Sequence, residues 1–155
     1  MWLSPHFHLS EFIKSNEATR RGIDNTPSSE VISSLSDLCN FVLEPIRINY
    51  GQAVRISSGY RCPALNAAVG GSKNSQHTLG KAADIEIIDL DNCDLALWIA
   101  NNLEFDQLIL EFHNHSRGPN DGWVHVSYNN GNNKNQVLTA KTINSKTMYL
   151  DGLIP

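Results

Sequence analysis

The stretch Ala82-Ala83-Asp84-Ile85-Glu86-Ile87 alternates between apolar and polar side chains, which is typical of a strand with one buried face. Successive side chains of a strand point to opposite faces of the sheet, so Asp84 and Glu86 share one face. Ile85 and Ile87 share the other face. This pattern predicts a carboxylate on the sheet face that lies opposite the apolar core.

Two later segments alternate in the same way. In Trp123-Val124-His125-Val126-Ser127, the two valines take one face and His125 takes the other. In the segment 106–112, Glu111 falls on the polar face. One sheet can therefore bury its apolar face under helices and carry Asp84, Glu111 and His125 together on its other face. The predicted apolar face of the segment 106–112 consists of Leu108, Leu110 and Phe112.

The first 50 residues have a helical pattern. From Val31, apolar residues recur with i, i+3, i+4 spacing, which predicts an amphipathic helix to about Ile48 that Pro45 kinks or restarts. Because helices precede the strands, we expect an α+β fold in which N-terminal helices pack on a central, mainly antiparallel sheet within a single domain, 1–155. The other predicted elements are a short helix after Ser10 as its N-cap, helices over 62–69 and 91–101, a strand over 53–58, and a hairpin-like tail after residue 135.

The composition narrows the function classes. The chain has 155 residues, of which 41% are hydrophobic and 18% charged, with a formal net charge of −4. A net negative charge argues against a protein that binds nucleic acid by neutralising phosphates. No apolar run approaches the roughly 18 residues of a membrane-spanning helix, and the first residues lack the pattern of a signal peptide. Three widely spaced cysteines without a CxxC motif predict neither a disulfide framework nor a thiolate zinc site.

A metal site is one interpretation of the polar face. His77 lies in a polar loop, seven residues before Asp84, and can reach the same place as His125. Two imidazoles and one carboxylate leave one tetrahedral position open, which is the pattern of catalytic zinc. Zinc lowers the pKa of a water in that position toward about 7, and a nearby carboxylate can accept its proton. From spacing alone, a solvated polar face is an equal alternative.

Several motifs together suggest a family. They are Ser58-Gly59-Tyr60-Arg61, the element Ser75-Gln76-His77-Thr78-Leu79-Gly80-Lys81-Ala82-Ala83-Asp84 and the strand 123–127. This set resembles the zinc D-Ala-D-Ala carboxypeptidase family, which is grouped with lysostaphin-type peptidases and the hedgehog signalling domain. The resemblance implies one Zn²⁺ held by His77, Asp84 and His125. It also implies that Arg61 binds a carboxylate of the substrate or polarises its carbonyl group.

The general base departs from the patterns of this family. Gly122 stands where an ExxH motif would place a glutamate, and Trp123 stands where an HxH motif would place a histidine. We expect Glu111 to be the base, because it shares the face of the ligands and a glutamate at the end of this strand fits the bacterial and phage branch. The alternatives are Asp121, His113 and His115.

The resemblance predicts a zinc metallopeptidase that hydrolyses peptide bonds of peptidoglycan stem peptides or other D-Ala-containing peptides by metal-activated water. A D-Ala-D-Ala carboxypeptidase and an endolysin-like endopeptidase both fit. The expected protein is a monomer without a nucleic-acid partner or a membrane span, either cytoplasmic or released from a lysing host to act on the cell wall. The alternative is a non-catalytic, zinc-containing module that binds cell wall or protein.

Overall fold

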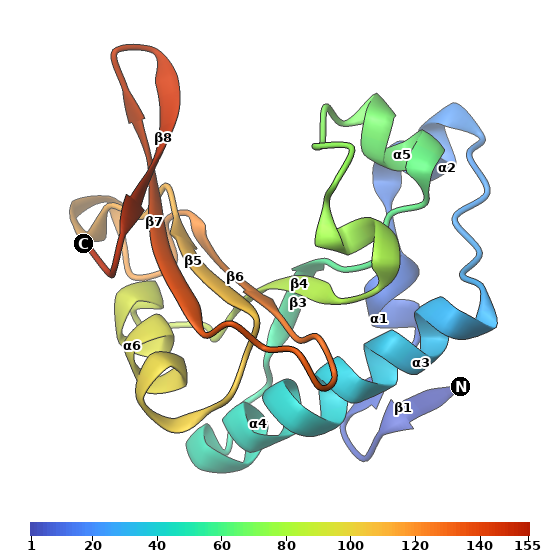
Figure 1. Cartoon of the computed structure of the whole chain (residues 1–155), viewed down its shortest axis with the longest axis horizontal. Coiled ribbons are helices and arrows are strands. Elements are labelled where there is room, and N and C mark those ends of the chain that lie inside the picture. The colour runs from blue at the N-terminus through green and yellow to red at the C-terminus, as the bar shows by residue number, and fades with distance from the viewer.

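The computed structural model describes all 155 residues (Figure 1). Two short strands and a series of helices come first, and most of the sheet follows. The helices are α1 (Ser10–Ile13), α2 (Asn16–Arg21), α3 (Ser29–Leu38), α4 (Glu44–Tyr50), α5 (Pro63–Ala68) and α6 (Asn92–Asn102). The strands are β1 (Trp2–Ser4), β2 (Phe7–His8), β3 (Arg55–Ser58), β4 (Ala82–Glu86), β5 (Gln107–Glu111), β6 (Trp123–Ser127), β7 (Gln136–Ile143) and β8 (Lys146–Asp151).

The main sheet has six strands in the order β3-β4-β6-β5-β7-β8. Every neighbouring pair is antiparallel except β5 and β7, which run parallel. The predicted α+β class and the mainly antiparallel sheet are therefore confirmed. The β1–β2 hairpin forms a separate sheet of two strands.

The apolar face of the sheet packs under the helices, as the alternation predicts. One cluster of 24 buried residues joins Ile85 of β4 and Val124 of β6 to Leu35 of α3, Ile46 of α4 and Ile99 of α6. Full burial of each such side chain contributes about 1.5–3 kcal/mol. This core holds the sheet by one face and leaves its opposite face available for polar side chains.

No helix is both long and apolar enough to cross a membrane.

Pro45 restarts the predicted long helix. A five-residue π turn, η1 (Cys39–Leu43), separates α3 from α4, and the Glu44 N–H donates to the carbonyl of Cys39, five residues earlier. The proline then lies in the first turn of α4, where a missing N–H costs no helical hydrogen bond. The wider turn thus accommodates the proline.

Two local expectations for the first 50 residues are wrong, and one helix was not predicted as a separate element. Residues 2–8 form the β1–β2 hairpin, because the buried carboxylate of Glu44 accepts hydrogen bonds from Ser4 Oγ at 2.7 Å and His6 N at 2.8 Å. A local sequence pattern cannot reveal Glu44 as a partner, because it lies about 40 residues away in the chain. Ser10 lies inside α1, with Leu9 as the N-cap residue. The unpredicted helix is α2, whose N-cap residue Ser15 accepts a hydrogen bond from Ala18 N.

The tail forms the predicted hairpin. β7 and β8 pair antiparallel, and the connecting Asn144 and Ser145 have φ values of 52° and 63°. Two successive residues with positive φ form the type of turn that matches the twist of a hairpin. The hairpin extends beyond the rest of the sheet and forms a wall on one side of the molecule (Figure 1).

Candidate active site

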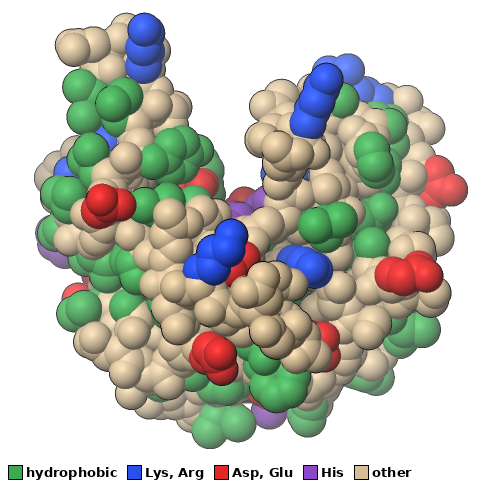
Figure 2. Space-filling view, viewed as in Figure 1, with side chains coloured by type: hydrophobic (Ala, Val, Ile, Leu, Met, Phe, Trp, Pro, Cys, Tyr) green, Lys and Arg blue, Asp and Glu red, His purple; other side chains and the backbone are tan.

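A cleft of about 600 Å³ lies on the polar face of the sheet. Figure 2 shows the molecule hollowed between two projections, with histidine side chains visible near the floor. Strands β4, β5 and β6 contribute the floor, residues 69–77 one wall, and Tyr149 of β8 the other. The charged and histidine residues among its lining are Arg61, His77, Asp84, Glu111 and His125.

Three predicted ligands meet at this floor. His77 Nε2 lies 3.4 Å from Asp84 Oδ1, and His125 Nδ1 lies 3.2 Å from the same oxygen. One ligand atom from each of the three residues lies within 4.8 Å of the others. All three side chains are buried. The structure thus brings together the two histidines and the aspartate that the sequence motifs single out.

Strand register and a short helical turn place these side chains. Asp84 of β4 is directly opposite His125 of β6 in the antiparallel ladder. His77 lies in a 3₁₀ turn, η2 (Gln76–Leu79), which Ser75 caps by accepting from His77 N. Gly80 ends this turn with a φ of 69°, and a Cβ there would lie 2.7 Å from a backbone oxygen of α3. A glycine at position 80 therefore supplies both the positive φ and the close approach to α3 that this turn requires.

The protonation of the site suits a cation. His77 Nδ1 donates to the carbonyl of Gly59 at 2.7 Å, so the lone pair of a neutral ring is on Nε2, which faces Asp84. Burial opposes ionisation of Asp84, but hydrogen bonds and charge from His125 and His77 hold its pKa well below its usual range. Ligands of tetrahedral zinc lie about 3.3 Å apart, given bonds of about 2.0–2.1 Å. The observed spacings of 3.2 and 3.4 Å therefore fit zinc.

Arg61 lies at the mouth of the cleft. Its two terminal nitrogens donate to Ser58 Oγ and Ser75 Oγ, each at 3.4 Å, and Nε has no hydrogen-bond partner. No carboxylate lies within ion-pair distance of this guanidinium, so it retains donors and charge for an external anion. Long hydrogen bonds to two hydroxyl groups orient Arg61 without neutralising it.

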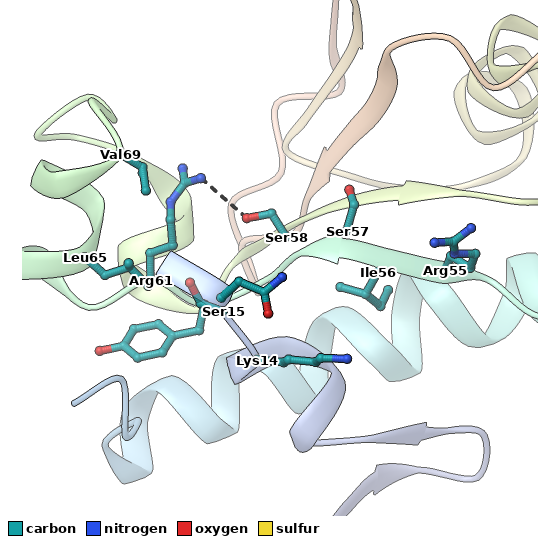
Figure 3. Close-up of a pocket in the computed structure, with 11 residues that line it drawn as sticks. Lys14, Ser15, Arg55, Ile56, Ser57, Ser58, Arg61, Leu65 and Val69 are labelled. Carbon is teal, nitrogen blue, oxygen red and sulfur yellow. Dashed lines mark hydrogen bonds between the residues drawn. The ribbon is translucent and has the colours of Figure 1, made fainter. Parts of the chain in front are cut away.

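A second, basic pocket adjoins the cleft at Arg61. It has a volume of about 490 Å³ and includes Lys14, Arg55 and Arg61 with several hydroxyl groups (Figure 3). Only Arg55 has an acidic partner, Glu86, whose carboxylate lies 3.5 Å away. Because Arg61 lines both spaces, a ligand at the floor of the cleft can extend over this positively charged surface.

Glu111 lies one row along the sheet from Asp84 and His125. It pairs with Trp123 of β6 and with Ala140 of β7, and Ala140 in turn pairs with Tyr149 of β8. Burial and the charge of Asp84 raise the pKa of Glu111, although His125 and Arg61 partly oppose this shift. A carboxylate with a raised pKa in a cleft is suited to accepting a proton.

The three alternative bases do not line the cleft. Phe112 has a φ of 53°, which ends the alternation of β5 and turns the chain away after Glu111. His113 and Asp121 contact each other, with His113 Nδ1 donating to the Asp121 carbonyl at 2.8 Å. The predicted orientation of Phe112 is wrong for the same reason: it packs with Ile109 on the cleft side.

Position 122 has no room for a glutamate. Gly122 has a φ of 70°, and a Cβ there would lie 2.1 Å from the carbonyl oxygen of Glu111. A side chain at this point would displace the end of β5. The backbone conformation at residue 122 therefore excludes the glutamate of an ExxH motif.

We expect Gly122→Ala to destabilise the protein by several kcal/mol and to disturb the position of Glu111. A residue with positive φ alone costs about 1–2 kcal/mol, and the backbone overlap adds to this cost. Gly131→Ala is the matched control, because Gly131 has a φ of 83° and open space around its Cβ position. Urea unfolding of both variants measures the difference. Equal losses of stability in the two variants would show that the backbone near residue 122 shifts to accommodate the Cβ without cost.

The alternation of strand 123–127 placed Trp123 on the face of His125, but sequence reasoning missed Phe112 and Tyr149 as residues of the cleft. Phe112, Trp123 and Tyr149 line it. Phe112 and Trp123 pack with their ring centroids 5.5 Å apart. Burial and the charge of Glu111 raise the pKa of Tyr149. Tyr149 reaches the cleft only through the pairing of β8 with β7, which no local pattern reveals.

Comparison with known proteins agrees with this geometry. Residues 5–127 match the sequence pattern of a family described as Peptidase M15. No curated protein matches the chain. The matched range includes His77, Asp84, Glu111 and His125, whereas β7 and β8 lie outside it. Because the match covers most of the chain, this protein belongs to the M15 peptidases, the family of the zinc D-Ala-D-Ala carboxypeptidases.

Proposed function

We propose that the protein is a zinc peptidase that hydrolyses peptide bonds in the stem peptides of peptidoglycan. The ligand set would be His77, Asp84 and His125. The observation that carries the proposal is the spacing of their ligand atoms, 3.2 and 3.4 Å around Asp84 Oδ1, at the floor of an open cleft. A set of three protein ligands leaves one tetrahedral position for catalysis.

In this proposal the metal, Glu111 and Arg61 have different tasks. Zinc, when bound, supplies a Lewis acid at the cleft floor. Glu111 accepts a proton from the attacking water and then delivers it to the leaving amine, a use that its raised pKa favours. Arg61 donates hydrogen bonds to a carbonyl or carboxylate oxygen of the substrate, where negative charge is present or develops.

The surface beside the cleft suits an anionic peptide. Stem peptides carry free carboxylates, and a carboxypeptidase substrate also ends in one. Lys14, Arg55 and Arg61 place positive charge along the pocket that continues from the cleft (Figure 3). Electrostatic attraction of this kind speeds association and weakens with added salt.

We expect Arg61→Ala to retain the metal and to lower kcat/KM by roughly 10- to 100-fold. Even one hydrogen bond from a charged donor contributes about 1.5–3 kcal/mol, and each 1.4 kcal/mol is tenfold in rate. Arg61→Lys is the matched control, because it retains the charge but loses the two-pronged donor geometry. Steady-state kinetics on a purified muropeptide measures the loss. Unchanged kinetics in Arg61→Ala would remove Arg61 from the site.

The function itself is tested on purified muropeptides. The protein should cleave them, lose activity with a chelator and regain it with added zinc. Mass spectrometry of the products identifies the bond: release of one D-Ala indicates a carboxypeptidase, and cleavage within the stem indicates an endopeptidase. A metal-loaded protein that binds muropeptides without cleaving them would contradict the proposal and support a binding module.

A further inference from the structure

A second cluster of metal-ligating side chains lies outside the cleft. It comprises Asp91, the N-cap residue of α6, together with His113 and His115 of the loop that joins β5 to β6. One ligand atom from each residue lies within 4.8 Å of the others, as in the first cluster. None of the three lines the cleft, so this cluster is separate from the candidate active site.

His113 is the reason to expect a cation here. Its side chain is fully buried, and its Nδ1 donates to the carbonyl of Asp121 at 2.8 Å. In a neutral ring this leaves the lone pair on Nε2. That atom lies 3.3 Å from Asp91 Oδ1 and has no hydrogen-bond partner. A buried acceptor next to a carboxylate oxygen is costly unless a positive charge lies near both.

The arrangement repeats that of the first cluster. There, His77 also donates through Nδ1 to a backbone carbonyl, and its Nε2 faces Asp84 Oδ1 at 3.4 Å. A carbonyl partner on one ring nitrogen commonly orients a metal-ligating histidine. The distance from His113 Nε2 to Asp91 Oδ1, 3.3 Å, like that from His77 Nε2 to Asp84 Oδ1, approximates the edge of a zinc tetrahedron, about 3.3 Å.

Asp91 and His115 complete the second set. The Asp91 carboxylate accepts from Cys93 N at 2.8 Å and contacts His115 Nδ1 at 2.5 Å through its other oxygen. The His115 side chain is 78% exposed, so solvent and ions can reach the cluster, and the ring can turn to coordinate.

We propose that Asp91, His113 and His115 form a second divalent transition-metal site. Two imidazoles and one carboxylate favour zinc, cobalt or nickel over calcium and magnesium, which prefer oxygen ligands. The bound ion links the start of α6 to the loop 113–122. That loop connects Glu111 of β5 to Trp123 and His125 of β6, so the ion stabilises the connection between two strands of the active site.

Metal stoichiometry tests this proposal. Metal-free protein is titrated with Zn²⁺ and Co²⁺ by calorimetry, and bound metal is counted by mass spectrometry after dialysis. We expect two equivalents of metal in the wild type and one in His115→Ala. The His115 side chain is exposed, so its removal leaves the core intact. Ser116→Ala, from the same loop, is the matched control and should bind two. One equivalent of bound metal in both the wild type and His115→Ala would overturn the proposal.

Stability provides a second measurement that does not depend on catalysis. In His125→Ala, which lacks one ligand of the first cluster, zinc at about 100 times its Kd should raise Tm by about 5–10 °C. Adding His115→Ala should abolish that rise. A rise that persists in the double variant would overturn the second site, whereas loss of peptidase activity with an intact second site would count only against the proposed function.

Discussion

Replacing Glu111 by Gln should leave metal content and fold unchanged and lower kcat by about 10²–10⁴-fold. The amide has the size of the carboxylate but cannot accept a proton from water. Because Glu111 lies one row along the sheet from Asp84 and His125 and is not in the candidate ligand set, no coordinating atom is removed. Metal analysis, circular dichroism and kinetics on the same preparation separate the loss of turnover from a loss of zinc.

Two further variants make this test specific. Glu104→Gln makes the same chemical change at an exposed position and should retain full activity. Asp121→Asn changes an alternative base that lies outside the cleft, and it should also retain activity. An active Glu111→Gln together with an inactive Asp121→Asn would move the base to the loop 113–122.

Replacing His125 by Ala should remove the metal of the cleft and abolish activity together. Its ring lies between β4 and β5 on the sheet floor, with Nδ1 3.2 Å from Asp84 Oδ1. Loss of one of three protein ligands leaves too few donors to hold zinc in a tetrahedral site. Metal analysis should show one equivalent fewer than in the wild type, and muropeptide cleavage should fall to background.

His8→Ala is the control for this second experiment. It removes an imidazole of the N-terminal hairpin, remote from the cleft, and should change neither metal content nor turnover. A fully active His125→Ala, or one that retains all its metal, would contradict the proposed ligand set. Added zinc should not restore activity to His125→Ala at concentrations that saturate the wild type.

Alternation along single strands was enough to divide the sheet into an apolar and a polar face. Ile85 and Val124 lie in the core, and Asp84 and His125 lie on the other face, because a side chain can point to only one of two sides of a strand. The helical spacing after Val31 likewise predicted α3, since its buried side chains recur with the period of a helix. These features depend on neighbours in the sequence.

Other features depend on partners that are distant in the sequence. The register that sets Asp84 opposite His125 joins residues 41 positions apart, and no local pattern specifies it. The N-terminal hairpin is held by Glu44, and Tyr149 reaches the cleft only across β7. These contacts arise from packing of the whole chain.

The sequence by itself determined the family, the strand faces and the set of candidate ligands, because each rests on residue type and short-range spacing. The tertiary structure alone decided that the alternative bases Asp121, His113 and His115 lie outside the cleft. The positive φ of Phe112 turns His113 away from it while Glu111 remains on the floor. It also decided that His113 meets Asp91 at a second cluster. A single backbone dihedral angle reverses a side chain's direction, and that angle depends on packing that residue order does not reveal.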